Sequence, residues 1–100
     1  HSNTIAALVP GAMSVTLPDG QRRTAAVSGG LIKVENNEVL VLADSAERPD
    51  EIDTNRAKRA EAKAREALLQ KQSIQEHKFT QATLARAINR LRVSHIHDTK

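Results

Sequence analysis

Apolar and polar positions alternate over the first forty-odd residues, which is the pattern of strands that bury one face. In residues 13–17, Met, Val and Leu alternate with Ser and Thr, and Pro18-Asp19-Gly20 follows directly. Proline presets φ, the aspartate side chain closes a turn, and glycine accepts a positive φ. These positions predict a hairpin whose second arm runs over residues 22–27.

Glycine, asparagine and proline mark the other breaks in this first segment. Asn36-Asn37 predicts a tight hairpin between two apolar runs, because asparagine tolerates the left-handed conformation. Gly29-Gly30 predicts a bulge or a close backbone approach. Pro10-Gly11 separates a strand over 4–9 from the strand that follows it. Residues 1–45 are therefore expected to hold about five strands of a partial β-sandwich.

The sheet is expected to be incomplete. An apolar strand begins at Thr4 with no capping segment before it, and a sandwich normally needs more strands than these to close. We therefore expect that the first strands of the domain are missing. An open sheet edge would then allow a non-physiological dimer.

A polar connector over residues 46–53 follows, in which Pro49 argues against a continuous helix. Asp53 suits an N-cap, and over residues 54–70 alanines recur at three- and four-residue intervals. This spacing predicts a helix with a stripe of small side chains. Because alanine buries little area, the helix is expected to hold its partners weakly.

A second helix is predicted over residues 74–93, because Ser73-Ile74-Gln75-Glu76 fits a capping box at its start. The loop between the helices is only a few residues long, so the pair is expected to form an antiparallel hairpin, domain 54–94. The tail 95–100 is expected to be flexible. The predicted fold class is α+β, a partial sandwich followed by a two-helix hairpin.

Charge divides the chain unequally. Residues 1–52 hold four Lys/Arg and seven Asp/Glu, for a net charge of −3, whereas residues 53–100 hold eleven and five, for +6. A basic half predicts either an anionic partner, such as nucleic acid, a nucleotide or an acidic protein surface, or a solvated helical face.

Several classes of function are not expected. The absence of cysteine excludes disulfides and thiolate chemistry. The longest apolar run, residues 5–9, is far shorter than the roughly 20 residues of a membrane-spanning helix, so direct membrane insertion is not expected. His77, His95 and His97 lack acidic partners at ligand spacing, and no residue has the arrangement of an activated nucleophile. Neither a metal site nor catalysis is predicted.

Short segments in a fixed order point to a family: Ala26-Val27-Ser28-Gly29-Gly30, residues 41–47, residues 52–57 and Arg86-Ala87-Ile88-Asn89-Arg90-Leu91. In that order and at that spacing they resemble the epsilon subunit of bacterial F-type ATP synthases. The resemblance spans essentially the whole chain, and His1 looks like the histidine of the family's proline-glycine-histidine turn.

This resemblance implies a non-catalytic subunit of the central stalk, which couples the catalytic head to the membrane rotor. The implied sandwich has ten strands and docks on the gamma subunit and the rotor c-ring. The implied hairpin folds against the sandwich or extends toward the alpha and beta subunits, where it regulates ATP hydrolysis. The implied location is peripheral, on the cytoplasmic face of the bacterial membrane.

The resemblance also implies a regulatory ATP site, although no cofactor is required. Some bacterial members bind ATP through an Ile-Asp-x-x-Arg-Ala motif and basic residues of both helices. Lys63 departs from that pattern, because lysine offers a point charge where an arginine fork is expected. The implied site residues are Glu47 and Asp53 near the base and ribose, Arg56, Lys63, Arg86 and Arg90 near the phosphates, and Ile52 and Ala57 of the motif.

The alternative is a small nucleic-acid-binding protein that uses a basic helical hairpin. Against it, the sequence lacks stacking aromatics, since Phe79 is the only aromatic residue, and acidic residues interrupt the basic ones. No nucleic-acid partner is therefore predicted.

Overall fold

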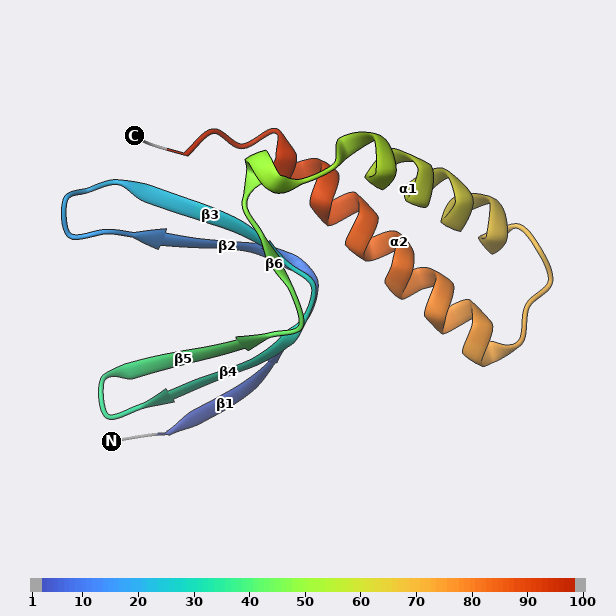
Figure 1. The fold of residues 1–100 in the computed structure, drawn as a ribbon. Helices are drawn as coiled ribbons and strands as arrows, with labels where there is room; N and C mark the ends of the chain where they lie inside the picture. Colours follow the sequence, from blue (N-terminus) through green and yellow to red (C-terminus); the bar gives the residue numbers. More distant parts are fainter. Residues whose placement is uncertain (1–2, 99–100) are drawn as a thin grey trace.

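Two three-stranded antiparallel sheets and a pair of helices make up the protein (Figure 1). The computed structural model describes residues 3–98. The strand orders are β1-β4-β5 and β2-β3-β6, and the α+β fold class is confirmed. The elements are β1 Thr4–Leu8, β2 Gly11–Thr16, β3 Arg22–Val27, β4 Gly30–Glu35, β5 Glu38–Ala43, β6 Ala46–Glu47, a 3-10 turn Pro49–Glu51, α1 Thr54–Leu68 and α2 Ile74–Ser94.

The hairpin turns form where the turn residues predict them. In the β2–β3 turn Gly20 has a φ of 88°, and the Asp19 carboxylate accepts a hydrogen bond of 3.0 Å from the Gln21 backbone N–H. Asn36 and Asn37 join β4 to β5 with φ values of 51° and 63°. Two left-handed residues give a turn whose twist matches that of the flanking strands, which fixes the register of this hairpin.

Gly30 allows the close backbone approach that the glycine pair predicts. Its φ is 143°, and a Cβ added there would collide with the backbone of Leu42 and Ala43 on β5. Only glycine fits where the two strands come this close.

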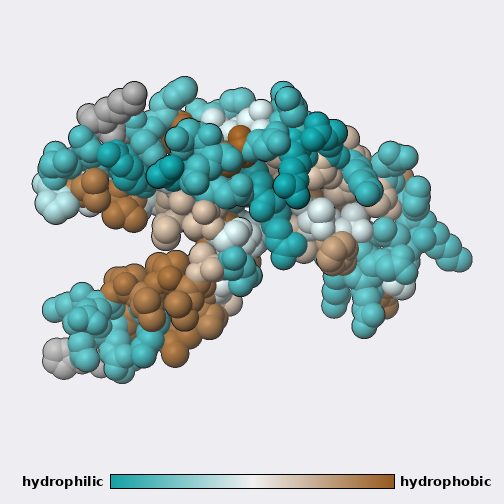
Figure 2. Space-filling model, in the orientation of Figure 1, coloured by the Kyte–Doolittle hydropathy of each residue, from teal (hydrophilic) through white to brown (hydrophobic). Residues whose placement is uncertain are grey.

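The sheets diverge from a shared corner and leave the sandwich open (Figure 1). The radius of gyration is 15.9 Å, whereas about 13 Å is typical of a compact chain of this length. Figure 2 shows apolar side chains gathered over the β1-β4-β5 sheet. No helix among residues 3–98 is long and apolar enough to cross a membrane.

Both faces of the β1-β4-β5 sheet are apolar. Ile32 and Val41 are cross-strand partners on the inner face, where they line a pocket of about 180 Å³ together with residues of β2 and β3. Because side chains alternate along a strand, their sequence neighbours lie on the outer face. The exposed apolar side chains of this outer face are Ile5, Leu31, Leu40 and Leu42, which are 48% to 70% exposed.

Side-chain caps start both helices. The Asp53 carboxylate accepts a hydrogen bond of 3.0 Å from the Arg56 backbone N–H, and the Ser73 hydroxyl accepts one of 3.1 Å from the Glu76 N–H. The Glu76 carboxylate accepts a hydrogen bond from the Ser73 hydroxyl. In a full capping box it would instead accept one from the Ser73 backbone N–H. The helices lie side by side as an antiparallel hairpin, with small buried residues such as Ala57, Ala64 and Ala87.

Helix α2 of the hairpin packs on the β2-β3-β6 sheet, where it meets the start of β2 and the end of β3 (Figure 1). Val93 is fully buried in a small cluster with Ala26 of β3 and Ile52, and Ile96 packs against this cluster. The buried Asn89 amide donates hydrogen bonds to the carbonyl oxygens of Gly11, at 3.0 Å, and Val27, at 3.4 Å. A carbonyl only accepts, so the amide orientation follows from these partners.

The segment 46–53 is more ordered than a simple connector. Its first two residues, Ala46 and Glu47, pair with Val27 and Ala26 as strand β6, and the 3-10 turn follows. A strand of two residues is too short to show an alternation of apolar and polar positions in the sequence. Proline nevertheless prevents a continuous helix, as predicted.

Residues 95–98 of the tail make contacts with the rest of the protein, and the flexibility expected for residues 95–100 stays a prediction. Ile96 packs against the joint, and the Asp98 carboxylate accepts a hydrogen bond of 3.0 Å from the Thr24 backbone N–H. Strand β6 pairs only with the last two residues of β3, so the N–H of Thr24 needs another acceptor. Residues 99 and 100 lie outside the described part of the chain.

Acid should release this tail. The backbone N–H and the side chain of Thr24 hold the pKa of Asp98 below its usual value, and Arg23 and Arg22 act in the same direction. A lowered folded-state pKa gives stability that is present above about pH 4 and lost as the pH falls through the lowered value. The Thr24 amide resonance should therefore stay constant from pH 7 to about pH 4 and shift below it.

The matched control is Asp98→Asn, which has no carboxyl to titrate and should abolish this shift. A midpoint at or above that of an ordinary aspartate would contradict the contact.

Candidate functional site

A pocket of about 370 Å³ lies between the segment that leaves β6, the start of α1 and the second half of α2. This volume is at the lower end of the range of small-molecule sites. The lining residues are Glu47, Glu51, Asp53, Arg56, Ala57, Ala60, Thr83, Arg86, Ala87 and Arg90.

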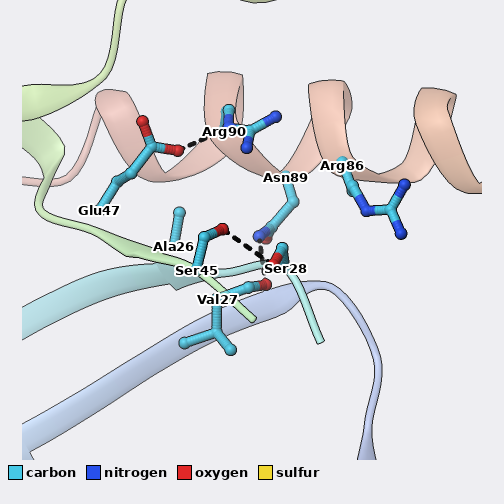
Figure 3. A pocket seen from close by; sticks show the side chains of 8 residues that line it. All are labelled: Ala26, Val27, Ser28, Ser45, Glu47, Arg86, Asn89 and Arg90. Atoms are coloured by element: carbon cyan, nitrogen blue, oxygen red, sulfur yellow. Dashed lines mark hydrogen bonds and ion pairs between the residues drawn. The ribbon is translucent and has the colours of Figure 1, made fainter. Parts of the chain in front are cut away.

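Two arginines of α2 form one wall. Arg86 and Arg90 are four residues apart and so lie on one helical face, with Asn89 beside them at the sheet (Figure 3). The Arg90 Nε donates a hydrogen bond of 2.6 Å to Glu47 Oε1, and both side chains are about one-third exposed. This ion pair ties α2 to β6.

The N-terminus of α1 forms the opposite wall. The Asp53 cap holds the helix start, so its carboxylate serves the structure as well as lining the pocket. Arg56 and Ala57 follow in the first turn. Because Ala57 and Ala87 are small and buried, the two helices can approach each other at the base of the pocket.

The charged groups of the pocket are unequally paired. Glu51 accepts a hydrogen bond of 2.9 Å from the Arg48 backbone N–H and pairs with the Arg48 side chain. Glu47 pairs with Arg90. Within residues 3–98, by contrast, neither Arg56 nor Arg86 has a side-chain hydrogen bond or ion pair. Two unpaired guanidinium groups at one pocket suit an anion, because charge-assisted hydrogen bonds to phosphate or carboxylate are strong.

The structure brings six of the eight predicted site residues together and leaves two outside. Ile52 is 8% exposed and belongs to the apolar joint with Val93, so its place in the motif reflects packing. Lys63 is exposed on α1, away from the pocket lining. The six that line the pocket are Glu47, Asp53, Arg56, Ala57, Arg86 and Arg90. Binding of a ligand by these residues stays a prediction.

Sequence reasoning missed two polar residues of the pocket. Thr83 precedes Arg86 by three residues and Arg90 by seven, so helical spacing alone would have placed it on the same face. Glu51 gives no comparable signal, because its position depends on the 3-10 turn. In the described part of the chain no group of three or more His, Asp or Glu side chains could hold a metal ion.

Two family models cover nearly the whole chain. "ATP synthase, Delta/Epsilon chain, beta-sandwich domain" matches residues 1–49, and "ATP synthase, Delta/Epsilon chain, long alpha-helix domain" matches residues 50–95. An ATP synthase epsilon chain of Ruminococcus albus is 39% identical over 95 residues, which cover 94% of this chain and 70% of that relative. The chain belongs to the ATP synthase epsilon-chain family.

Other members of this epsilon family extend the comparison. An epsilon chain of Caldicellulosiruptor bescii is 43% identical over 76 residues, which cover 76% of this chain and 56% of that relative. This epsilon chain thus spans about half the length of several curated relatives that it matches. A chain in the cryo-EM structure of the Euglena gracilis mitochondrial ATP synthase has the same fold, with a TM-score of 0.73 and 24% identity over 89% of this chain and 56% of that one.

The boundary between the two family domains runs through the wall of the pocket. It lies between residues 49 and 50, inside the 3-10 turn. Glu47 therefore comes from the sandwich domain of this epsilon chain, whereas the other lining residues come from the helical domain. Any ligand that fills the pocket would contact both domains.

Proposed function

We propose that the protein acts in the central stalk of a bacterial F-type ATP synthase, as a non-catalytic subunit that couples the catalytic head to the membrane rotor. Membership of the epsilon family supports this function over the nucleic-acid-binding alternative. The partners are the gamma subunit, the rotor c-ring and the alpha and beta subunits. The protein then sits peripherally on the cytoplasmic face of the membrane.

The outer face of the β1-β4-β5 sheet is the surface we assign to the stalk. Sheets whose two faces are both apolar are usually covered on both sides, and a cluster of exposed aliphatic side chains commonly marks an interface. Leu31 and Leu42 are cross-strand neighbours on this face, about half exposed, with Leu40 beside them. The gamma subunit is the partner we place there.

The helical hairpin is the regulatory element in this proposal. It contacts the sheet through the Val93 cluster, the Asn89 hydrogen bonds and the partly exposed Glu47–Arg90 ion pair, so few buried side chains must separate when it leaves. Two-state elements of this kind exchange at a cost of a few kcal/mol. A docked and an extended position of the hairpin would give the enzyme a permissive and an inhibited state.

ATP is the ligand we assign to the pocket. The observation that carries this assignment is that Arg56 and Arg86, both unpaired, meet Arg90 at one cavity. Three guanidinium groups can bind the oxygens of a triphosphate once Arg90 is released from Glu47. The carboxylates of Asp53 and Glu47 are the acceptors we assign to ribose or base donors. Because the pocket spans both domains, bound ATP would stabilise the docked hairpin by mass action.

Binding of ATP should depend on Arg86. Calorimetric titration at low salt should show a single site, and Arg86→Ala should weaken it about tenfold, since it removes a charge-assisted hydrogen bond. Arg92→Ala is the matched control, because Arg92 is an exposed arginine of the same helix that does not line the pocket. Equal losses in both variants would show nonspecific attraction, and no binding at millimolar ATP would refute the site.

Capture by the gamma subunit tests the stalk function. Immobilised gamma should retain the wild-type chain, and Leu40→Glu should abolish retention by placing a charge on the outer face of the sheet. Ile74→Glu is the control, because Ile74 is 77% exposed at the far end of the hairpin and should not affect capture. If Leu40→Glu binds gamma as well as the wild type does, the outer face is not the docking surface.

A further inference from the structure

The ion pair between Glu47 and Arg90 differs from other ion pairs of the protein in what it connects. Lys33–Glu35, Arg48–Asp50 and Arg65–Glu61 each join near neighbours in the sequence. Glu47 and Arg90 are 43 positions apart and belong to different domains. Their contact, which Figure 3 shows as a dashed line, is also the shortest of these, at 2.6 Å. Both residues line the candidate site.

We propose that Glu47 is an internal competitor for Arg90, and that an anionic ligand must displace it to bind. The proposal rests on the nucleotide site proposed above and concerns how that site is regulated. With the pair intact, the Glu47 carboxylate occupies the position beside Arg90 that a phosphate oxygen would take. The ligand-free pocket therefore has one of its three arginines already engaged.

The position of Glu47 makes it an effective competitor. Its backbone pairs with Ala26 of β3, so the sheet fixes where the carboxylate can reach. Arg90 stands on α2 one residue after Asn89, which the carbonyls of Gly11 and Val27 hold in place. The backbones of both partners are thus held by regular elements, so forming the pair costs side-chain freedom but no further ordering of the backbone.

Displacement is feasible because the pair is only partly buried. Glu47 and Arg90 are 32% and 36% exposed, so water can solvate the carboxylate once Arg90 turns to a phosphate. The exchange replaces one acceptor of the Arg90 guanidinium by another. Its net effect is to lower the affinity of the site for an anion.

Inorganic tripolyphosphate is the probe that isolates this exchange, because it has the phosphate chain but neither base nor ribose. We expect Glu47→Gln to bind it about fivefold more tightly than the wild type, since the substitution removes the competing charge. Glu35→Gln is the matched control. Glu35 is also a partly exposed, ion-paired glutamate, but it pairs with Lys33 and does not line the pocket, so the same loss of charge should change the affinity less than twofold.

The outcomes separate the inference from the function on which it rests. If Glu47→Gln binds tripolyphosphate no more tightly than the wild type, or if Glu35→Gln binds it as tightly as Glu47→Gln, the competitor role is wrong even though the site exists. If no variant binds tripolyphosphate or ATP, the site itself is wrong. Binding by Glu47→Gln where the wild type shows none would support both.

A parallel titration with ATP tests the ribose or base contact that the proposed function assigns to Glu47. If this carboxylate contacts the ribose or base of the nucleotide, Glu47→Gln will bind ATP more weakly and tripolyphosphate more tightly than the wild type. Glu47 is then a ligand contact as well as a competitor. The competitor role alone requires both ligands to bind more tightly. The Arg90 Nε–H resonance should also move on addition of tripolyphosphate to the wild type.

Discussion

The joint between the sheet and the helical hairpin is the contact on which the arrangement of the molecule depends. Its centre is one fully buried valine, Val93, packed on Ala26 and Ile52, and one amide, Asn89, bonded to two carbonyls of the sheet. The Glu47–Arg90 ion pair adds a partly exposed contact between α2 and β6. The amide makes the joint specific, because a misplaced helix would leave buried carbonyls without donors. The small apolar cluster keeps it weak, because few methyl groups leave water when the hairpin docks.

The candidate site depends on this joint for its shape. Glu47 comes from the sheet and the arginines come from the helices, so the pocket exists only while the hairpin is docked. Under the proposed function, ligand binding and docking would be thermodynamically linked, and each would strengthen the other by the same factor. The alanines at the helix interface act in the same direction. Ala57 and Ala87 let the two walls of the pocket lie close together, but they bury too little apolar area to form a large core in the hairpin.

Local chemistry was readable from the sequence, and contacts between distant segments were not. The turn at Asn36-Asn37 and the caps at Asp53 and Ser73 depend on residues within four positions of each other, and the structure has each of them. The bond from Thr24 to Asp98 joins residues 74 positions apart, and strand β6 is too short to show a pattern. For the site, helical spacing and the family resemblance predicted that the arginines lie together. No local rule shows that Ile52 faces the core.

The most direct test of this account is the distance between the two domains in solution. The chain has no cysteine, so spin labels can be placed at the exposed positions Asp19 and Leu69 and their separation measured by pulsed electron paramagnetic resonance. A weak joint predicts two populations, docked and detached, with Val93→Ala enlarging the detached one and ATP enlarging the docked one. A single narrow distance that neither Val93→Ala nor ATP alters would contradict the account.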